Sequence, residues 1–280
     1  MGYLMTMRKR IGHIARDLFL IILLIYTLAP FFILFFNSMK TKEDFYLNPF
    51  GVPKTFNFSN YSSAWVKGGY TEAYLNSLLI CCTAIVFVVL FACMAAYALA
   101  KMNFRGQNIV MTYFVLSMSI PVSLFLVPLF FIFKTVGLMN TIQGLIIIYI
   151  AIYIPFNIIF LRSFILGIPS LILESASLDG CSDWGVFWYI ILPVSKPALF
   201  TSALLVFLWS WNEFFYANAF ISTGSLKPVS TRYLAFTGTY ATDWTLVCAA
   251  GMISILPIMT AYLLFQRNFI EGLMSGSIKG

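Results

Sequence analysis

The strongest constraint on this chain is a series of apolar runs, each about as long as a lipid bilayer is thick. A helix needs roughly 20 consecutive, mostly apolar residues to cross the hydrocarbon core of a membrane. The first run follows the basic cluster Arg8-Lys9-Arg10. Counting this one, the runs lie at residues 18–36, 76–99, 110–133, 142–161, 198–221 and 246–265. The sequence therefore predicts an all-α membrane protein with six transmembrane helices.

Composition argues against several other classes. Of the 280 residues, 61% are hydrophobic and 10% are charged, whereas a soluble domain carries about 25% charged residues. The net charge of +7 comes from scattered Lys and Arg residues without an arginine-rich stripe, so we expect no nucleic-acid partner. The five cysteines are an odd number and mostly lie in apolar runs, which argues against a disulfide framework. His13 is the only histidine, which excludes an HExxH-type zinc site.

The distribution of Lys and Arg predicts the orientation, because these residues favour cytoplasmic loops. With the amino terminus inside, the inner segments hold ten of them and the outer segments seven. Six spans then place both termini in the cytoplasm. The expected divisions are a cytoplasmic basic tail (1–17), a first transmembrane helix (18–36), an extracytoplasmic loop (37–75), a core domain of five spans (76–267) and a cytoplasmic tail (268–280). Prolines within the spans indicate kinked helices around a path or, equally, irregular packing.

A polar segment at residues 168–197 separates two of the apolar runs and is predicted to be cytoplasmic. Ile168-Pro169-Ser170 predicts a helix start, and Asp179-Gly180 predicts the turn that ends this helix after Leu178. A second helix then follows. It carries four apolar residues with i, i+3, i+4, i+7 spacing, which predicts one common face: Trp184, Phe187, Trp188 and Ile191. Pro193 and Pro197 are expected to close it. On this pattern alone, a generic helical hairpin at the membrane surface is an equally good interpretation.

A resemblance favours a more specific interpretation. The segment reproduces the spacing EAA-x3-G-x9-I-x-LP at Glu174, Ala176, Gly180, Ile190, Leu192 and Pro193, with Ser175 in place of the first alanine. It resembles the cytoplasmic signature of membrane subunits of binding-protein-dependent ATP-binding-cassette importers. The stretches 95–106, 209–220 and 266–280 are similar to MalG-like permeases of carbohydrate importers. The resemblance implies the type I importer permease architecture, in a bacterial or archaeal cell (inner) membrane.

In that family the segment is a coupling helix that docks into a cleft of the ATPase. The resemblance assigns contact with the ATPase to Glu174, Ser175, Ala176, Asp179, Gly180, Trp184, Phe187, Trp188, Ile190, Leu192 and Pro193. Glu174 is suited to pair with a basic group, and an aromatic face is suited to bury in a groove. The implied partners are a second, MalF-like permease, an ABC ATPase dimer, an extracytoplasmic solute-binding protein and membrane lipid. The outer segments 37–75 and 222–245 should face the binding protein, and the tail 268–280 should contact the ATPase.

No enzymatic motif is present. The chain lacks the phosphate loop GxxxxGK[ST], so we expect ATP and Mg²⁺ on the partner ATPase and no cofactor on this transport subunit. A secondary transporter or channel independent of ATP is the alternative. Such proteins usually show intramembrane acids or inverted repeats, whereas this chain has one acid in a predicted span and no detectable repeat.

That acid, Glu213, is the main candidate for the translocation path. A charge inside a bilayer costs about 2.5–3.5 kcal/mol on insertion scales, so it normally faces a cavity or a partner. We expect Asn212 and Glu213 to lie near sugar hydroxyls, with tryptophan or tyrosine rings stacking on the sugar. The candidates are Asn212, Glu213, Trp209, Trp211, Tyr216 and, more weakly, Asn157 and Gln143. The alternative is a structural role, in which Glu213 pairs with a neighbouring helix or with the partner permease.

Overall fold

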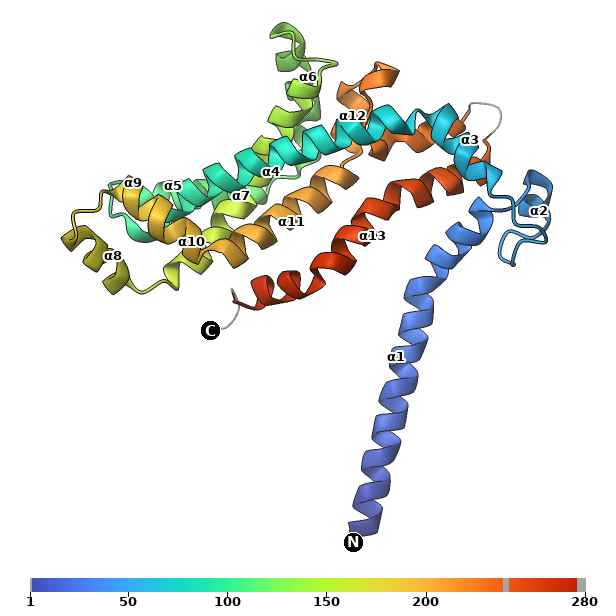
Figure 1. The fold of residues 1–280 in the computed structure, drawn as a ribbon, viewed down its shortest axis with the longest axis horizontal. Coiled ribbons are helices and arrows are strands. Elements are labelled where there is room, and N and C mark those ends of the chain that lie inside the picture. The colour runs from blue at the N-terminus through green and yellow to red at the C-terminus, as the bar shows by residue number, and fades with distance from the viewer. Residues whose placement is uncertain (1, 239–241, 276–280) are drawn as a thin grey trace. The chain divides into compact units, whose positions relative to one another are not determined.

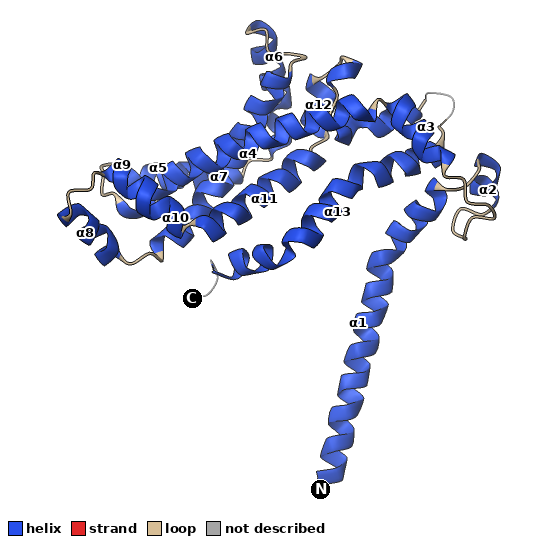
Figure 2. Ribbon diagram, in the orientation of Figure 1, coloured by secondary structure: helices blue, strands red, loops and turns tan. Residues whose placement is uncertain are grey.

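The computed structural model describes residues 2–238 and 242–275, with side chains over residues 13–238 and 242–267. Helices dominate this described part (Figure 2), and its only β feature is an isolated bridge between Thr237 and Thr242. The predicted all-α class is confirmed. The chain forms two compact units: Met1–Gly68 with Tyr233–Ile255, and Gly69–Arg232 with Leu256–Gly280.

The helices of the two units follow the chain order shown in Figure 1. The first unit contains α1 (Gly2–Ser38), α2 (Lys42–Leu47), α3 (Ser59–Gly68) and the beginning of α13 (Trp244–Ser275). The second unit contains α4 (Tyr70–Lys101), α5 (Gln107–Met118), η1 (Val122–Phe125), α6 (Leu126–Thr135), α7 (Ile142–Leu166), α8 (Ser170–Leu178), α9 (Asp183–Val186), η2 (Phe187–Ile191), α10 (Leu192–Val194), α11 (Lys196–Asn212), α12 (Phe215–Phe220), η3 (Gly224–Leu226) and the rest of α13. The short helix η4 (Val229–Phe236) crosses the boundary between the units.

Four described helices are long and apolar enough to cross a membrane: His13–Ser38, Tyr70–Lys101, Ile142–Leu166 and Trp244–Arg267. They match the expected first, second, fourth and sixth spans, with longer ends. Two further candidates are helix pairs that bend, so the number is six if each pair counts as one span. The structure therefore supports a multi-pass membrane protein with four to six spans.

The structure corrects the expected third span at a bend and the expected fifth span at the end of α11. The second bent pair joins Asp183–Val194 to Lys196–Asn212 at 77°, so its bend lies before the fifth predicted span. Gln107–Met118 and Val122–Thr135 meet at 93°, so residues 110–133 are not one continuous helix. Pro121 lies in this break, and proline both lacks an N–H and disfavours the helical conformation of the residue before it. The fifth predicted span, 198–221, is wrong beyond Asn212, where α11 ends and Glu213 takes an extended conformation with ψ of 114°.

The core of the second unit forms where α4 packs against α7 and α11. The three helices run side by side in Figure 1. The face of α4 that is buried carries small residues, Ala92, Cys93 and Ala96, all 0% exposed. Small residues let helix backbones approach closely, which is how membrane helices gain packing contacts. This core continues into the polar segment through Phe187 and Ile191, so the predicted cytoplasmic hairpin is anchored on the spans.

A cluster of polar residues in the first unit, here called the polar module, lies at the carboxyl end of α1, within residues 37–60. Its hydrogen-bonded centre consists of Asn37, Ser38, Lys40, Asn48 and Asn60. The buried Lys40 Nζ donates hydrogen bonds to Asn37 Oδ1 at 2.8 Å and to the Asn48 carbonyl at 2.5 Å. Asn60 Nδ2 donates to the carbonyls of Ser38 and Lys40, at 2.9 and 2.8 Å. Burial lowers the pKa of Lys40, and the nearby Asp44 opposes this effect. The part of the predicted outer loop that follows α1 is therefore folded around a buried cation.

One ion pair joins this module to residues distant in sequence. Lys42 Nζ lies 2.9 Å from Asp243 Oδ2, and Asp243 Oδ1 also accepts a hydrogen bond from Thr245 Oγ1 at 2.8 Å. The packing thereby groups residues 233–255 with the amino-terminal segment, whereas the sequence analysis placed them within the core domain.

Candidate functional site

The acidic half of the predicted cytoplasmic hairpin is α8, and it has the predicted bounds. Pro169 precedes the helix, Asp179 is its C-cap, and Gly180 follows with φ of +82°. This left-handed conformation is accessible to glycine at little cost. The side chain of Glu174 is exposed. Ala176 and Leu173 pack against the core of the second unit, so α8 presents its acidic face and keeps an apolar contact on the other side.

The second half of the hairpin differs from the predicted single aromatic face. Residues Phe187–Ile191 form a π-helix, in which hydrogen bonds join residues five apart and the side-chain register shifts. Phe187 and Ile191 are 2% and 0% exposed, whereas Trp184 and Trp188 are 60% and 50% exposed. Phe187 is therefore a core residue, whose ring centroid lies 6.0 Å from that of Tyr97 in α4. The expected single aromatic face is corrected, while the contact of Phe187 with an ATPase stays a prediction.

The remaining motif residues divide in the same way. Ser175 is exposed, and its hydroxyl donates to the Leu171 carbonyl at 2.8 Å within α8. Ile190 and Leu192 are partly buried against the core, and Pro193 is exposed. Ala176, Ile190 and Leu192 thus fasten the hairpin to the spans, whereas Glu174, Ser175 and Gly180 lie at the surface.

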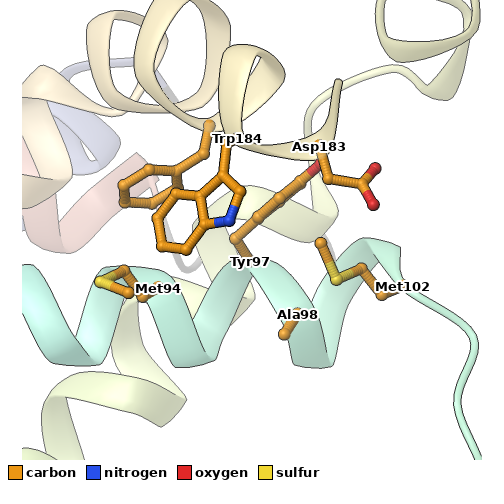
Figure 3. Close-up of a pocket in the computed structure, with 7 residues that line it drawn as sticks. Met94, Tyr97, Ala98, Met102, Asp183 and Trp184 are labelled. Carbon is orange, nitrogen blue, oxygen red and sulfur yellow. The ribbon is translucent and has the colours of Figure 1, made fainter. Parts of the chain in front are cut away.

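Two hollows flank the hairpin. Figure 3 shows the smaller one, a cavity of about 300 Å³. Its lining includes Asp183 and Trp184 of α9, Met94 and Tyr97 of α4, and Met102 just beyond the end of α4. The larger hollow, about 1030 Å³, lies between α8 and the end of α4. Its lining includes Lys101, Phe104, Leu173, Glu174 and Ser177. The exposed acid of α8 therefore borders a recess large enough to receive side chains of another protein.

A third hollow lies among the spans of the second unit, with a volume of about 520 Å³. Asn212 and Glu213 line it at the end of α11. Its aromatic wall consists of Trp209 and two residues of α7: the Trp209 ring lies 5.0 Å from that of Phe156 and 5.5 Å from that of Tyr153. This arrangement of flat rings beside an amide and a carboxylate suits a ligand with both apolar faces and hydroxyl groups.

The carboxylate of Glu213 is held by donors from its own chain. Tyr149 donates its hydroxyl to Glu213 Oε2 at 2.8 Å, and the backbone N–H groups of Tyr216 and Ala217 donate at 2.8 and 3.0 Å. The backbone carbonyl of Glu213 accepts from the Ser230 hydroxyl at 2.6 Å. Glu213 thus satisfies the first N–H groups of α12 in the manner of a helix cap, as the structural alternative predicts, while still bordering the hollow.

Three other path candidates are buried by contacts within the chain. Trp211 is 2% exposed and its ring lies 5.5 Å from that of Tyr74. Tyr216 is 2% exposed and donates its hydroxyl to the Val122 carbonyl at 2.6 Å. Asn157 is 0% exposed, and its Oδ1 accepts from the Ser202 hydroxyl at 2.5 Å. Packing between helices thus occupies these three side chains, and their contact with a ligand stays a prediction.

Sequence reasoning missed Tyr149, Tyr153 and Phe156 as members of this site. They recur along α7 at i, i+4 and i+7, which places them on one face of the helix, but nothing in the sequence indicates that this face meets the end of α11. The predicted contact of the tail 268–280 with an ATPase concerns side chains that lie outside the described residues.

Comparison with known proteins shows what the chain is similar to. Residues 68–274 match the family described as binding-protein-dependent transport system inner membrane component. The probable ABC transporter permease YurM of Bacillus subtilis (strain 168) is 34% identical over 96% of this chain and 90% of its own length. The diacetylchitobiose uptake system permease NgcG of Streptomyces coelicolor (strain ATCC BAA-471 / A3(2) / M145) is 31% identical over 97% of this chain and 90% of its own length.

A solved structure shares the fold. A chain from a bacterial ABC transporter for the import of the acidic polysaccharide alginate superposes with a TM-score of 0.82, at 24% sequence identity. The match covers 93% of this chain and 97% of the other. The two chains therefore share one arrangement of helices.

Proposed function

Because this chain belongs to the family of binding-protein-dependent transport system inner membrane components, we propose that it is the permease subunit of an ATP-driven importer for a sugar or oligosaccharide. The observation that carries the coupling part of this proposal is the hairpin at residues 168–197. Its acidic helix α8 is exposed at Glu174 and turns at Gly180, while Phe187 is buried in the core of the spans. This arrangement is expected of a docking element, because α8 is exposed to a partner while the second half of the hairpin is packed against the transmembrane helices.

The proposed partners follow from what the chain lacks. Without a phosphate loop in its sequence, it takes the energy of transport from a separate ABC ATPase dimer, where ATP and Mg²⁺ bind. A second, MalF-like permease completes the path, and an extracytoplasmic binding protein delivers the solute. A solved bacterial alginate ABC transporter is described in complex with a periplasmic protein that carries the alginate pentasaccharide, which supports the binding protein as a partner.

The proposed topology has six spans, with both termini in the cytoplasm of a bacterial or archaeal cell. The bent pair Gln107–Met118 with Val122–Thr135 then counts as one span, and α11 (Lys196–Asn212) supplies the fifth, so that the hairpin before it stays cytoplasmic. Residues 37–75 and 222–245 face the binding protein, and residues 76–267 form the core permease domain. The basic cluster before the first helix supports this orientation.

The proposed path runs along the hollow lined by Trp209, Tyr153, Asn212 and Glu213. Aromatic rings supply flat apolar surfaces for a sugar ring, and the amide of Asn212 supplies a hydrogen-bonding group. The name of the Streptomyces relative, which refers to diacetylchitobiose uptake, supports a sugar as the solute.

The test is ATPase activity of the reconstituted complex with its binding protein and a panel of sugars. We expect a sugar-loaded binding protein to stimulate hydrolysis in the wild type. Glu174→Lys should abolish stimulation or release the ATPase, because it reverses the exposed charge of α8. Asp17→Lys is the matched control, since it reverses an exposed acid that faces Arg16 in α1. Transport by this chain alone under an ion gradient, indifferent to Glu174, would overturn the proposal.

A further inference from the structure

Where the hairpin joins the spans, the cationic side chains of Lys101 and Arg162 each form a hydrogen bond with a segment other than their own helix. Lys101 is the last residue of α4, and its Nζ donates to the Ile168 carbonyl at 2.6 Å, just beyond the end of α7. Arg162 lies in the last turns of α7, and its Nε donates to the Leu99 carbonyl at 3.0 Å, near the end of α4. Each helix therefore supplies a cation to the carboxyl end of the other.

The chemistry of helix ends explains why these contacts form. The last four carbonyls of a helix have no partner within it, and the carboxyl end carries partial negative charge that favours Lys and Arg. The Nζ of Lys101 also lies 3.5 Å from the Leu166 carbonyl. Gln107, the first residue of α5, donates to the same Leu99 carbonyl at 2.8 Å. Three helices thus meet at one small set of carbonyl oxygens.

The position of these contacts matters more than their number. Ile168 is 5% exposed and belongs to the core, and α8 begins only two residues later, at Ser170. A displacement of α8 must therefore act on the backbone at Ile168 before it reaches α7. Because Lys101 holds that backbone oxygen, the displacement acts on α4 at the same time.

The helix α4, which carries Lys101, is a long helix of the second unit. The helix α4 has 32 residues, which corresponds to roughly 48 Å at a rise of 1.5 Å per residue. It packs against both α7 and α11, and these two helices supply Tyr153 and Trp209 to the hollow among the spans.

We propose that Lys101 and Arg162 are positioning residues that make the carboxyl ends of α4 and α7 move as one body with the hairpin, so that movement of α8 is transmitted to the spans. The proposal rests on the proposed function, since it requires a partner that moves α8. Ordinary helix capping would give the same contacts but would affect only stability and assembly. The two roles differ in how much transport accompanies each ATP hydrolysed.

The experiment measures solute uptake and ATP hydrolysis together in proteoliposomes that contain the full complex and the loaded binding protein. The variants are Lys101→Met and Arg162→Met, which are shorter but keep an unbranched apolar stem and remove the charge. Lys101→Arg tests rescue, and Arg105→Met, an exposed cation of the turn between α4 and α5, is the matched control. We expect each Met variant to lower uptake per ATP by roughly fivefold or more, the lower end of typical couplings between distant sites.

The outcomes are distinct. The proposal is supported if the Met variants assemble and hydrolyse ATP but take up little solute. It also requires that Lys101→Arg recovers uptake per ATP and that Arg105→Met behaves as the wild type. Unchanged uptake per ATP overturns it, even if complex yield falls, because the contacts then serve stability alone. If the wild-type complex itself shows no stimulation by its binding protein, the proposed function fails and not only this inference.

Discussion

At the residue scale, the informative position is Glu213, whose carboxylate accepts three hydrogen bonds within the chain. Two of the donors are backbone N–H groups at the start of α12, and the third is the buried hydroxyl of Tyr149. A buried donor that loses its acceptor bears its full desolvation cost. The primary role supported by this geometry is to hold α12 and α7 at the end of α11.

Replacement of this carboxylate should therefore lower stability. We expect Glu213→Ala to destabilise the permease by about 1–3 kcal/mol, because the donors are left without an acceptor. Tyr149→Phe removes one donor and should cost less. The measurement is the thermal denaturation midpoint of the purified complex, with sugar uptake recorded in parallel.

The neighbouring Asn212 provides the control for this prediction. Its side chain is exposed, and its amide Nδ2 donates to the Leu208 carbonyl within α11 at 2.8 Å. Asn212→Ala should therefore leave the thermal denaturation midpoint unchanged. A normal midpoint for Glu213→Ala combined with lost uptake would contradict the structural role and favour direct contact with the solute.

At the element scale, the hairpin depends on the backbone conformation of Gly180 in the turn after α8. Gly180 has φ of +82°, and a methyl group placed there would meet no atom within 4 Å. The requirement for glycine therefore comes from the backbone and not from crowding. The left-handed conformation costs roughly 1–2 kcal/mol for most other residues, while asparagine adopts it more readily.

Substitutions at this turn should follow that order. We expect Gly180→Ala to reduce the amount of ATPase that copurifies with the permease, and Gly180→Asn to reduce it less, because α8 is displaced when the turn changes. Gly224→Ala is the matched control, since Gly224 also has open space but no positive φ. Equal losses in the alanine and asparagine variants would show that the backbone conformation is not the cause.

A second prediction at this scale concerns the ion pair between Lys42 and Asp243. Partial burial raises the pKa of Asp243, but hydrogen bonds from Lys42, Thr245 and the Leu246 N–H outweigh it, and the net pKa is lowered. The pKa of Lys42 is raised by its hydrogen bond to Asp243. A lowered carboxylate pKa stabilises the folded state above the unfolded value of about 3.9, and this contribution is lost as the pH falls through the folded value.

The polar module should therefore loosen in acid. We expect hydrogen exchange of the backbone at residues 242–247 to become faster as the pH falls below about 4, after correction for the intrinsic pH dependence of exchange. Lys42→Met should weaken this dependence, because it removes the principal partner of Asp243. Lys54→Met, at a lysine of the same module that contacts Asp44 only through its backbone N–H, should leave it intact. A pH profile of Lys42→Met identical to that of the wild type would exclude the ion pair as the cause.

At the scale of the whole molecule, the exposed apolar surface agrees with a membrane protein. The most hydrophobic window of α1 is 0% buried, so lipid or a partner permease must cover it. The exposed Ser62 in α3 and the exposed Ser177 in α8 lie on segments that the proposed topology places on opposite sides of the bilayer. These two serines allow the orientation to be measured directly.

We expect Ser62→Cys to react with a membrane-impermeant thiol reagent in intact cells or spheroplasts, and Ser177→Cys to react only after permeabilisation. The background should carry Cys82→Ser and Cys181→Ser, because these are the native cysteines that are not buried. Labelling of Ser177→Cys in intact cells would reverse the orientation and remove the hairpin from contact with a cytoplasmic ATPase.

The sequence by itself determined the features that depend on local patterns. Apolar runs of bilayer length predicted the membrane class, Asp179-Gly180 predicted the turn after α8, and the spacing around Glu174 indicated the importer family, which the family match confirms. These features can be recognised because the length of an apolar run, the residues of a turn and a short motif each lie within about twenty consecutive residues.

The tertiary structure decided which side chains meet. The burial of Phe187 in its π-helix and the contact between Tyr149 and Glu213 each depend on how one helix is rotated and placed against another. The same holds for Lys101 and Arg162, whose acceptor carbonyls belong to segments distant in sequence. Helical periodicity defines the face of a helix but not the neighbour of that face, and only the packed structure supplies the neighbour.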